Sequence, residues 1–179
     1  MSKQIAVSFE SGYAKVSYGS QRNGALVITR TFTVKEDEFD AFLAREKTKD
    51  FIVLFSFQTF YQDVLLLPRV EMKYVDTLIE AEIKKNAPEL KNFVFFSTIL
   101  KEKVHEGRPV RETFVFAVDS TEINPILERF SRFGKRVKRL YADVFVLSCL
   151  VVGLDNVKDK TAMCMIDKGD YKTLFLVRE

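Results

Sequence analysis

With 179 residues, the chain is long enough for one ordinary domain or two small ones. Apolar residues make up 47% and charged residues 30%, which predicts a soluble globule, and the net charge of +3 is too small by itself to indicate a nucleic-acid-binding protein. No apolar run approaches the ~20 residues of a membrane-spanning helix, and the first residues lack the pattern of a signal peptide, so we expect a cytoplasmic protein. The chain has 17 phenylalanines and no tryptophan, which predicts a phenylalanine-rich core. Cys149 and Cys164 lie in apolar stretches and are expected to be buried free thiols.

The first five predicted elements are a three-stranded meander, a helix and a central strand. Alternating apolar and polar residues predict antiparallel strands over Ile5–Glu10 and Tyr13–Ser20 and a third strand over Gly24–Val34. An apolar face and an acidic first turn predict a helix over Glu36–Glu46. The almost wholly apolar Phe51–Phe57 is typical of a strand covered on both faces, so we expect it inside the sheet and parallel to the first strand. This order is that of the first half of a ribonuclease-H-like layer.

The next stretch predicts a compact α+β unit of about 80 residues. Its elements are a strand, a helix, two strands, a helix and a strand, over Asp63–Leu67, Val70–Asn86, Phe93–Lys103, Val110–Asp119, Thr121–Phe133 and Val137–Ala142. Pro88 ends the first helix, whereas Ser120 or Thr121 is the expected N-cap of the second helix and Gly134 its C-cap. We expect this unit to be inserted after the first layer.

The last part of the chain predicts a short apolar helix over Val144–Gly153 and a second hairpin. The strands of the hairpin are Ala162–Ile166 and Thr173–Val177, joined by turn residues 167–170. The second hairpin is similar in shape to the first, and we expect it to begin a second domain that this chain does not complete.

Four stretches, taken in order, carry a resemblance to a known family. They are the opening hairpin with Lys15 on its second strand, Leu65-x-Leu67-Pro68 with the acidic helix that follows, strand 114–118 with the next helix and strand, and Asp167-x-Gly169-x-x-x-Thr173. Together they resemble the PilM family of type IV pilus assembly proteins, in the actin-like ATPase superfamily, or the related cytoplasmic domain of the GspL family of type II secretion. The resemblance implies an α/β fold with an actin-like (ribonuclease-H-like) first domain that begins in residues 1–62. It further implies an inserted α+β subdomain in residues 63–142, and a return to the actin-like core with a truncated second domain in residues 143–179.

The resemblance also implies a candidate nucleotide site. In actin-like ATPases two hairpins clasp the phosphates, and an aspartate in each helps to position magnesium. The matching positions are Ser11, Gly12, Lys15, Asp167, Gly169 and Thr173. Ser8 and Glu10, however, stand where the family has aspartate and glycine. At ~4 Å and an effective dielectric constant of ~20, the Glu10 carboxylate would oppose a phosphate charge by about 4 kcal/mol. We therefore expect a degenerate site and no cofactor, with ATP and magnesium as the alternative.

Other reactive residues favour structural roles. His105 is the only histidine and has no second ligand at metal spacing, so we expect a solvated turn residue and no metal. Ser148 and Cys149 lie in an apolar helix without a nearby base, which favours core packing over nucleophilic chemistry. Asp143 is explained as well by capping as by metal binding.

The sharpest charge feature is a basic run. It consists of Arg129, Arg132, Lys135, Arg136, Lys138 and Arg139. Such a run can contact the phosphates of nucleic acid or of anionic lipid. Basic residues near a helix end also suit the helix dipole, and aromatic residues at single-strand-binding spacing are absent from the run. A solvated surface is therefore the favoured interpretation.

The predicted function is a non-catalytic cytoplasmic scaffold at the inner face of the inner membrane, in a type IV pilus or type II secretion platform. The resemblance implies a platform partner such as a PilN-like tail, contact with the assembly or secretion ATPase, and a peripheral position at the membrane through these partners. No nucleic-acid partner is expected, and a homodimer stays open. Two alternatives remain, namely an actin-like ATP-binding protein whose nucleotide state gates partner binding, and a basic nucleic-acid-binding module.

Overall fold

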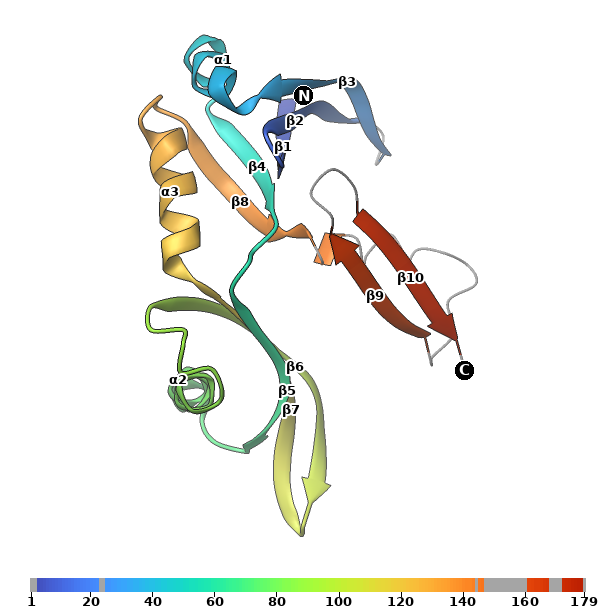
Figure 1. The fold of residues 1–179 in the computed structure, drawn as a ribbon. Helices are drawn as coiled ribbons and strands as arrows, with labels where there is room; N and C mark the ends of the chain where they lie inside the picture. The colour runs from blue at the N-terminus through green and yellow to red at the C-terminus, as the bar shows by residue number, and fades with distance from the viewer. Residues whose placement is uncertain (1–2, 23–24, 144, 147–160, 168–171, 179) are drawn as a thin grey trace. The chain divides into compact units, whose positions relative to one another are not determined.

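The computed structural model describes residues 3–22, 25–143, 145–146, 161–167 and 172–178, and Figure 1 shows their fold. The chain divides into a first unit, residues 1–56 and 127–179, and a second unit, Phe57–Ile126. Within the described ranges, no helix is long and apolar enough to cross a membrane.

A five-stranded sheet in the order β3-β2-β1-β4-β8 forms the first unit. Its strands are β1 (Lys3–Glu10), β2 (Tyr13–Arg22), β3 (Ala25–Lys35), β4 (Asp50–Phe55) and β8 (Arg136–Ala142). The meander β1-β2-β3 is antiparallel, β4 runs parallel to β1, and β8 runs parallel to β4. The predicted meander and the predicted central parallel strand are both confirmed.

One face of this sheet is apolar because side chains alternate along each strand. Its fully buried members are Ile5, Val7, Ala14, Val16, Phe51 and Val53. Helix α1 (Phe39–Arg45), preceded by the short helix η1 (Glu36–Glu38), buries Phe39 and Leu43 against them. The predicted helix over Glu36–Glu46 is therefore confirmed.

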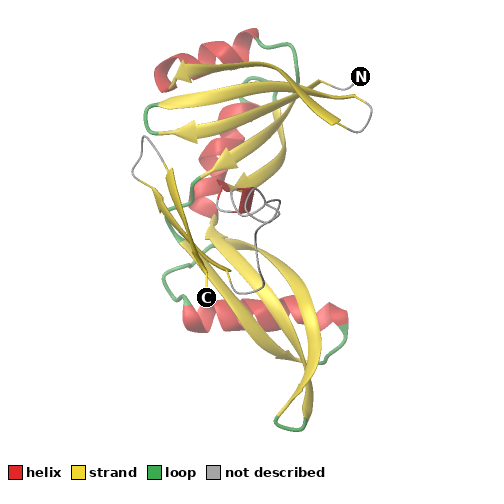
Figure 2. Ribbon diagram, turned by 90° about the vertical axis from the view of Figure 1, so that its right-hand side faces the viewer, coloured by secondary structure: helices red, strands yellow, loops and turns green. Residues whose placement is uncertain are grey.

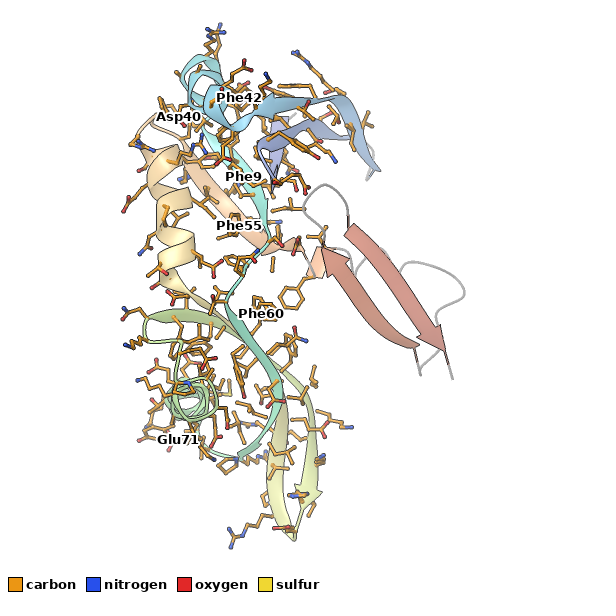
Figure 3. The ribbon with its side chains drawn as sticks, viewed as in Figure 1. Phe9, Asp40, Phe42, Phe55, Phe60 and Glu71 are labelled. Atoms are coloured by element: carbon orange, nitrogen blue, oxygen red, sulfur yellow. The ribbon has the colours of Figure 1, made fainter. Side chains whose placement is uncertain are left out.

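Phenylalanine rings fill the space between this face and the helices. The ring centroid of Phe130, on α3 (Ser120–Ser131), lies 5.1 Å from that of Phe51, 5.8 Å from that of Phe39 and 6.4 Å from that of Phe9, each in an edge-to-face arrangement. Figure 3 labels Phe9 and Phe55, whose centroids are 6.4 Å apart. The predicted phenylalanine-rich core is present in the described part of the first unit.

The second unit is a three-stranded antiparallel sheet with one helix on it. The sheet has the order β5-β7-β6, formed by β5 (Phe60–Pro68), β6 (Phe93–His105) and β7 (Arg108–Asp119). Helix α2 (Val75–Asn86), preceded by η2 (Met72–Tyr74), lies across one face of this sheet (Figure 2). Val75, Ile79 and Ile83 recur every four residues and pack on Leu65, Leu67, Val115 and Ala117.

The turns and caps follow local chemistry. Glu106 and Gly107 both have positive φ, 50° and 74°, as a two-residue hairpin turn requires. The N-cap of α3 is Asp119 and not the predicted Ser120 or Thr121, because the Asp119 carboxylate accepts hydrogen bonds from the Thr121 amide at 2.8 Å and the Thr121 hydroxyl at 2.7 Å. These two bonds lower the pKa of Asp119. Gly134, at φ 65°, follows the end of α3 as predicted.

The strand predicted over Val137–Ala142 was wrongly placed in the inserted unit. It is β8, which pairs with β4 at the edge of the five-stranded sheet. Adjacent parallel strands need a crossover connection, and α3, directly before β8, completes this one. The inserted unit accordingly spans Phe57–Ile126 and its sheet has three described strands.

Two further strands form a separate hairpin near the end of the chain. β9 (Thr161–Asp167) pairs antiparallel with β10 (Lys172–Arg178), which confirms the predicted strands. The helix predicted over Val144–Gly153 lies largely outside the described residues, as do Ser148 and Cys149.

Candidate functional site

The first hairpin holds three of the predicted nucleotide residues. Ser11 and Gly12 form an exposed turn, in which Gly12 has φ 77° and its carbonyl accepts a hydrogen bond of 3.0 Å from the Glu36 amide. Lys15 is exposed on β2, directly opposite Ser8 on β1. The Ser8 hydroxyl donates to the Glu10 carboxylate at 3.0 Å. The hairpin thus offers one lysine and an open turn, with a carboxylate at the end of β1 where the turn begins.

The second hairpin holds the other three predicted residues. Asp167 ends β9 opposite Lys172, and Thr173 lies opposite Ile166. Gly169 lies outside the described residues. The nucleotide site across both hairpins therefore stays a prediction.

Half of the basic run is bound to groups of the first unit. The Arg129 side chain donates to the Asp40 carboxylate at 2.6 Å and to the Glu36 carbonyl at 2.8 Å. Arg136 makes two hydrogen bonds of 3.0 Å to the Asp50 carboxylate, and the Lys135 ammonium donates to the Glu46 carbonyl. The run therefore presents fewer free cations than its sequence suggests, which weakens the nucleic-acid interpretation.

The described residues contain no group of three or more histidine, cysteine, aspartate or glutamate side chains that could hold a metal ion. His105 ends β6, where its side chain is half exposed and its Nε2 lies 4.0 Å from the Glu106 carboxylate. It is a surface residue beside a turn, as predicted.

The most distinctive surface lies on the second unit. Leu65, Leu67, Val115 and Ala117 point toward α2, so the residues between them in sequence point to the opposite side of the sheet. On that side, which we call the outer face, the apolar residues include Phe60, Val64, Leu66, Val94, Phe96 and Phe116. Figure 3 labels Phe60 at the start of β5.

The outer face exposes large apolar side chains. Phe96 is 58% exposed, Phe60 49% and Val94 48%. Phe116 on the central strand is itself buried, lies opposite Phe96 in register, and has its ring centroid 5.5 Å from that of Phe60. Several apolar residues thus gather on one side of three neighbouring strands. Such a concentration marks an interaction site more often than a bare surface.

The sequence itself carries a signal for the outer face. Strands with one solvated face alternate apolar and polar residues, whereas Val64–Leu67, Phe93–Phe96 and Phe114–Val118 are apolar at both odd and even positions. A single helix can cover only one side of the sheet that such strands form. The pattern therefore predicts a second apolar face.

The two units with this topology define an α/β protein with an actin-like fold, in which an α+β unit is inserted into the first domain. The chain is similar to the PilM–PilN type IV pilus biogenesis complex, with a TM-score of 0.73 and 16% identity over 98% of this chain. It is also similar to the cytoplasmic domain of EpsL, an inner-membrane component of the type II secretion system of Vibrio cholerae, with a TM-score of 0.65 and 14% identity over 99% of this chain.

A third similar structure is a Bacteroides thetaiotaomicron protein with an actin-like ATPase fold and unknown function, with a TM-score of 0.51 and 12% identity over 98% of this chain. The chain spans 58%, 71% and 65% of these three structures, in the order given. At these identities the likeness shows the fold, and it confirms the predicted actin-like fold and the predicted resemblance to pilus and secretion components. No family model and no curated protein matches the sequence.

Proposed function

We propose that the protein is a non-catalytic scaffold that binds the tail of a membrane-platform protein on the outer face of the second unit. The observation that carries the proposal is the set of half-exposed apolar side chains on that face. The likeness to a PilM structure in complex with PilN and to the EpsL cytoplasmic domain supports a platform role. The tail is then PilN-like, the protein is cytoplasmic and lies at the inner membrane through its partners, and the assembly or secretion ATPase is a further partner.

The size of the exposed side chains is sufficient for such a contact. A phenylalanine that is 58% exposed, as Phe96 is, presents about 100 Å² of apolar surface. At ~25 cal/mol per Å², covering it contributes about 2.5 kcal/mol. Phe60 and Val94 add similar or smaller amounts. Because association costs at least ~4 kcal/mol in lost freedom, a tail that covers all three residues binds with modest affinity.

A matched pair of valines on β6 tests the site. Val94 lies on the outer face, whereas Val104 is 72% exposed near the other end of the same strand. The probe is a labelled synthetic peptide of the N-terminal tail of the PilN-like protein from the same organism, and the readout is fluorescence anisotropy. We expect Val94→Ser to weaken binding about tenfold and Val104→Ser to leave it within about twofold. Equal effects of the two changes would place the tail elsewhere.

A nucleotide-gated switch is the second candidate, supported by Lys15 beside the turn of the first hairpin. It is tested by calorimetric titration of magnesium and ATP against the full-length protein and a Ser8→Asp, Glu10→Gly variant. The scaffold predicts binding by the variant alone, because removal of an opposing charge worth about 4 kcal/mol corresponds to roughly a thousandfold gain in affinity. Tight binding by the unmodified protein would instead establish the switch.

A further inference from the structure

The edge strand β3 of the first unit lacks the charged protection that the other edge strand, β8, has. The sheet order β3-β2-β1-β4-β8 makes β3 and β8 its two edges. Among the described strands, none pairs with the outer side of β3 along its 11 residues. An edge strand presents a row of backbone N–H and C=O groups on which another strand can pair.

The β8 edge is protected in the way that natural sheet edges are. It carries Arg136, Lys138 and Arg139, and the register shifts in this part of the β4–β8 pair, which indicates a bulge. On β3, by contrast, Ile28 is 61% exposed and Val27 is also exposed. The β3 edge therefore lacks the dense charge that normally prevents pairing.

A groove runs beside the β3 edge. It has a volume of about 590 Å³ and is lined from β3 by Arg30, Phe32, Thr33 and Val34 and from the side of α1 by Ala41, Phe42 and Arg45. Phe32 is paired with the buried Val16 and Val34 with the buried Ala14, so both point to the α1 side of the sheet, the side to which alternate side chains of an added strand would also point.

Aromatic rings line this groove. The Phe32 and Tyr18 rings are stacked with centroids 6.0 Å apart, and the Phe32 and Phe42 rings meet edge to face at the same distance. The rings give an apolar lining to which a side chain of an added strand can bind.

The groove and the hollow that adjoins it are lined by three cations, Arg30, Arg45 and Lys47, and by two carboxylates, Glu38 and Glu46. The Arg30 guanidinium lies over the Phe32 ring, 4.5 Å from its centroid, and Arg45 ends α1. In the part of the chain that the structure describes, neither guanidinium has a carboxylate within 4.0 Å. The acidic residues on the groove lining are Glu38 and Glu46.

The Glu46 carboxylate is already satisfied. It accepts hydrogen bonds from the Tyr18 hydroxyl and, at 2.8 Å, from the Thr48 amide. Partial burial would raise the pKa of Glu46, but these bonds outweigh it and hold the pKa below its ordinary value. Lys47 lines the adjoining hollow and adds a third cation. An incoming carboxylate therefore meets arginines whose charge Glu46 does not fully compensate.

We propose that the β3 edge and its groove form a second docking surface, which takes an extended acidic segment of a partner protein as an added strand. Backbone hydrogen bonds to β3 hold the segment. Alternate side chains point toward the groove, where a carboxylate pairs with Arg30 or Arg45 and an apolar side chain lies on the aromatic rings. The surface is separate from the outer face of the second unit and does not depend on the function proposed for that face.

The probe is a short blocked peptide of alternating glutamate and valine with one central phenylalanine, titrated against the full chain by calorimetry. The control peptide has lysine in place of glutamate. We expect the acidic peptide alone to bind, and we expect it to slow amide hydrogen exchange along β3. Arg45→Glu should weaken binding about tenfold, whereas the same charge change at the exposed Arg132 should not.

Three results would overturn the proposal. The first is that the peptide protects amides on β5, β6 or β7 instead of β3, and the second is that Arg45→Glu and Arg132→Glu weaken binding equally. The third is that β3 amides are protected in the absence of peptide, to a degree that increases with protein concentration. The last result would show that a second copy of the chain occupies the edge. The milder Arg30→Gln variant, with its circular dichroism spectrum as a check of folding, repeats the test without a charge reversal.

Discussion

Replacing Phe130 with alanine should destabilise the first unit by about 4 kcal/mol. The Phe130 side chain is fully buried and contacts the rings of Phe9, Phe39 and Phe51. Truncation of a buried phenylalanine costs about 3–5 kcal/mol, because apolar surface is lost and a cavity remains. Loss of three edge-to-face contacts places this site in the upper half of that range.

Phe96 is the matched control on the second unit. Its ring is already 58% exposed, so Phe96→Ala loses less than half of the transfer free energy of a buried ring, about 1 kcal/mol, and leaves no closed cavity. The two variants change the same side chain in the same way. One site is a buried position on a helix and the other an exposed position on a strand, and the expected difference between them is about 3 kcal/mol.

Native-state hydrogen exchange is the suitable assay, because it reports the free energy of opening for each unit separately. Amides of β4 report the first unit and amides of α2 the second. We expect Phe130→Ala to speed exchange in β4 more than a hundredfold under conditions in which exchange tracks stability, and Phe96→Ala to speed exchange in α2 less than tenfold. A Phe96→Ala cost as large as that of Phe130→Ala would refute the reasoning, because the outer face would then be packed like a core and could not receive a tail.

Three further predictions concern stability. The Thr113 hydroxyl is buried without a hydrogen-bond partner among the described residues. Thr113→Val should therefore raise the free energy of unfolding, measured in urea melts, by about 1 kcal/mol. The control Thr98→Val, at an exposed site, should not raise it. Gly134 has φ 65°, so Gly134→Ala should lower the melting temperature by an amount equivalent to about 1 kcal/mol, and an unchanged melting temperature would contradict the cap. Because the pKa of Glu46 is lowered in the folded state, its contribution to stability is present above the ordinary pKa of 4.5 and is lost as the pH falls through the folded pKa. Tyr18→Phe should reduce the stability that is lost at low pH, and a carboxyl titration of this variant by NMR should show a higher pKa for Glu46.

Local patterns were sufficient to predict most of the strands and helices. The alternation in Ile5–Ser20 specifies a hairpin, and the unbroken apolar run after Asp50 specifies a strand inside a sheet. Both signals lie within a few residues of the element that they describe. The fold class followed from their order, and the solved structures confirmed it.

Partners far apart in sequence could not be predicted in this way. The sequence predicts a strand over Val137–Ala142, but nothing in the seven residues of β8 indicates that it pairs with β4. The same limit applies to the basic run. The bond from Arg129 to Asp40 and that from Lys135 to the Glu46 carbonyl each span 89 positions. The sequence therefore shows the run of cations but not the groups that bind half of them.

The outer face follows from the sequence pattern of the strands that form it. Strands that are apolar at odd and even positions form a sheet that is apolar on both sides, and in the second unit α2 covers one side only. On the outer face Phe116 and Val118 are buried, whereas Phe60, Val94 and Phe96 remain about half exposed. The side packed on α2 keeps the unit folded, and the half-exposed side chains of the outer face are the ones that the proposed tail would cover. Substitutions on the α2 side should therefore lower stability and binding together, whereas substitutions of Phe60 or Val94 should lower binding with little loss of stability.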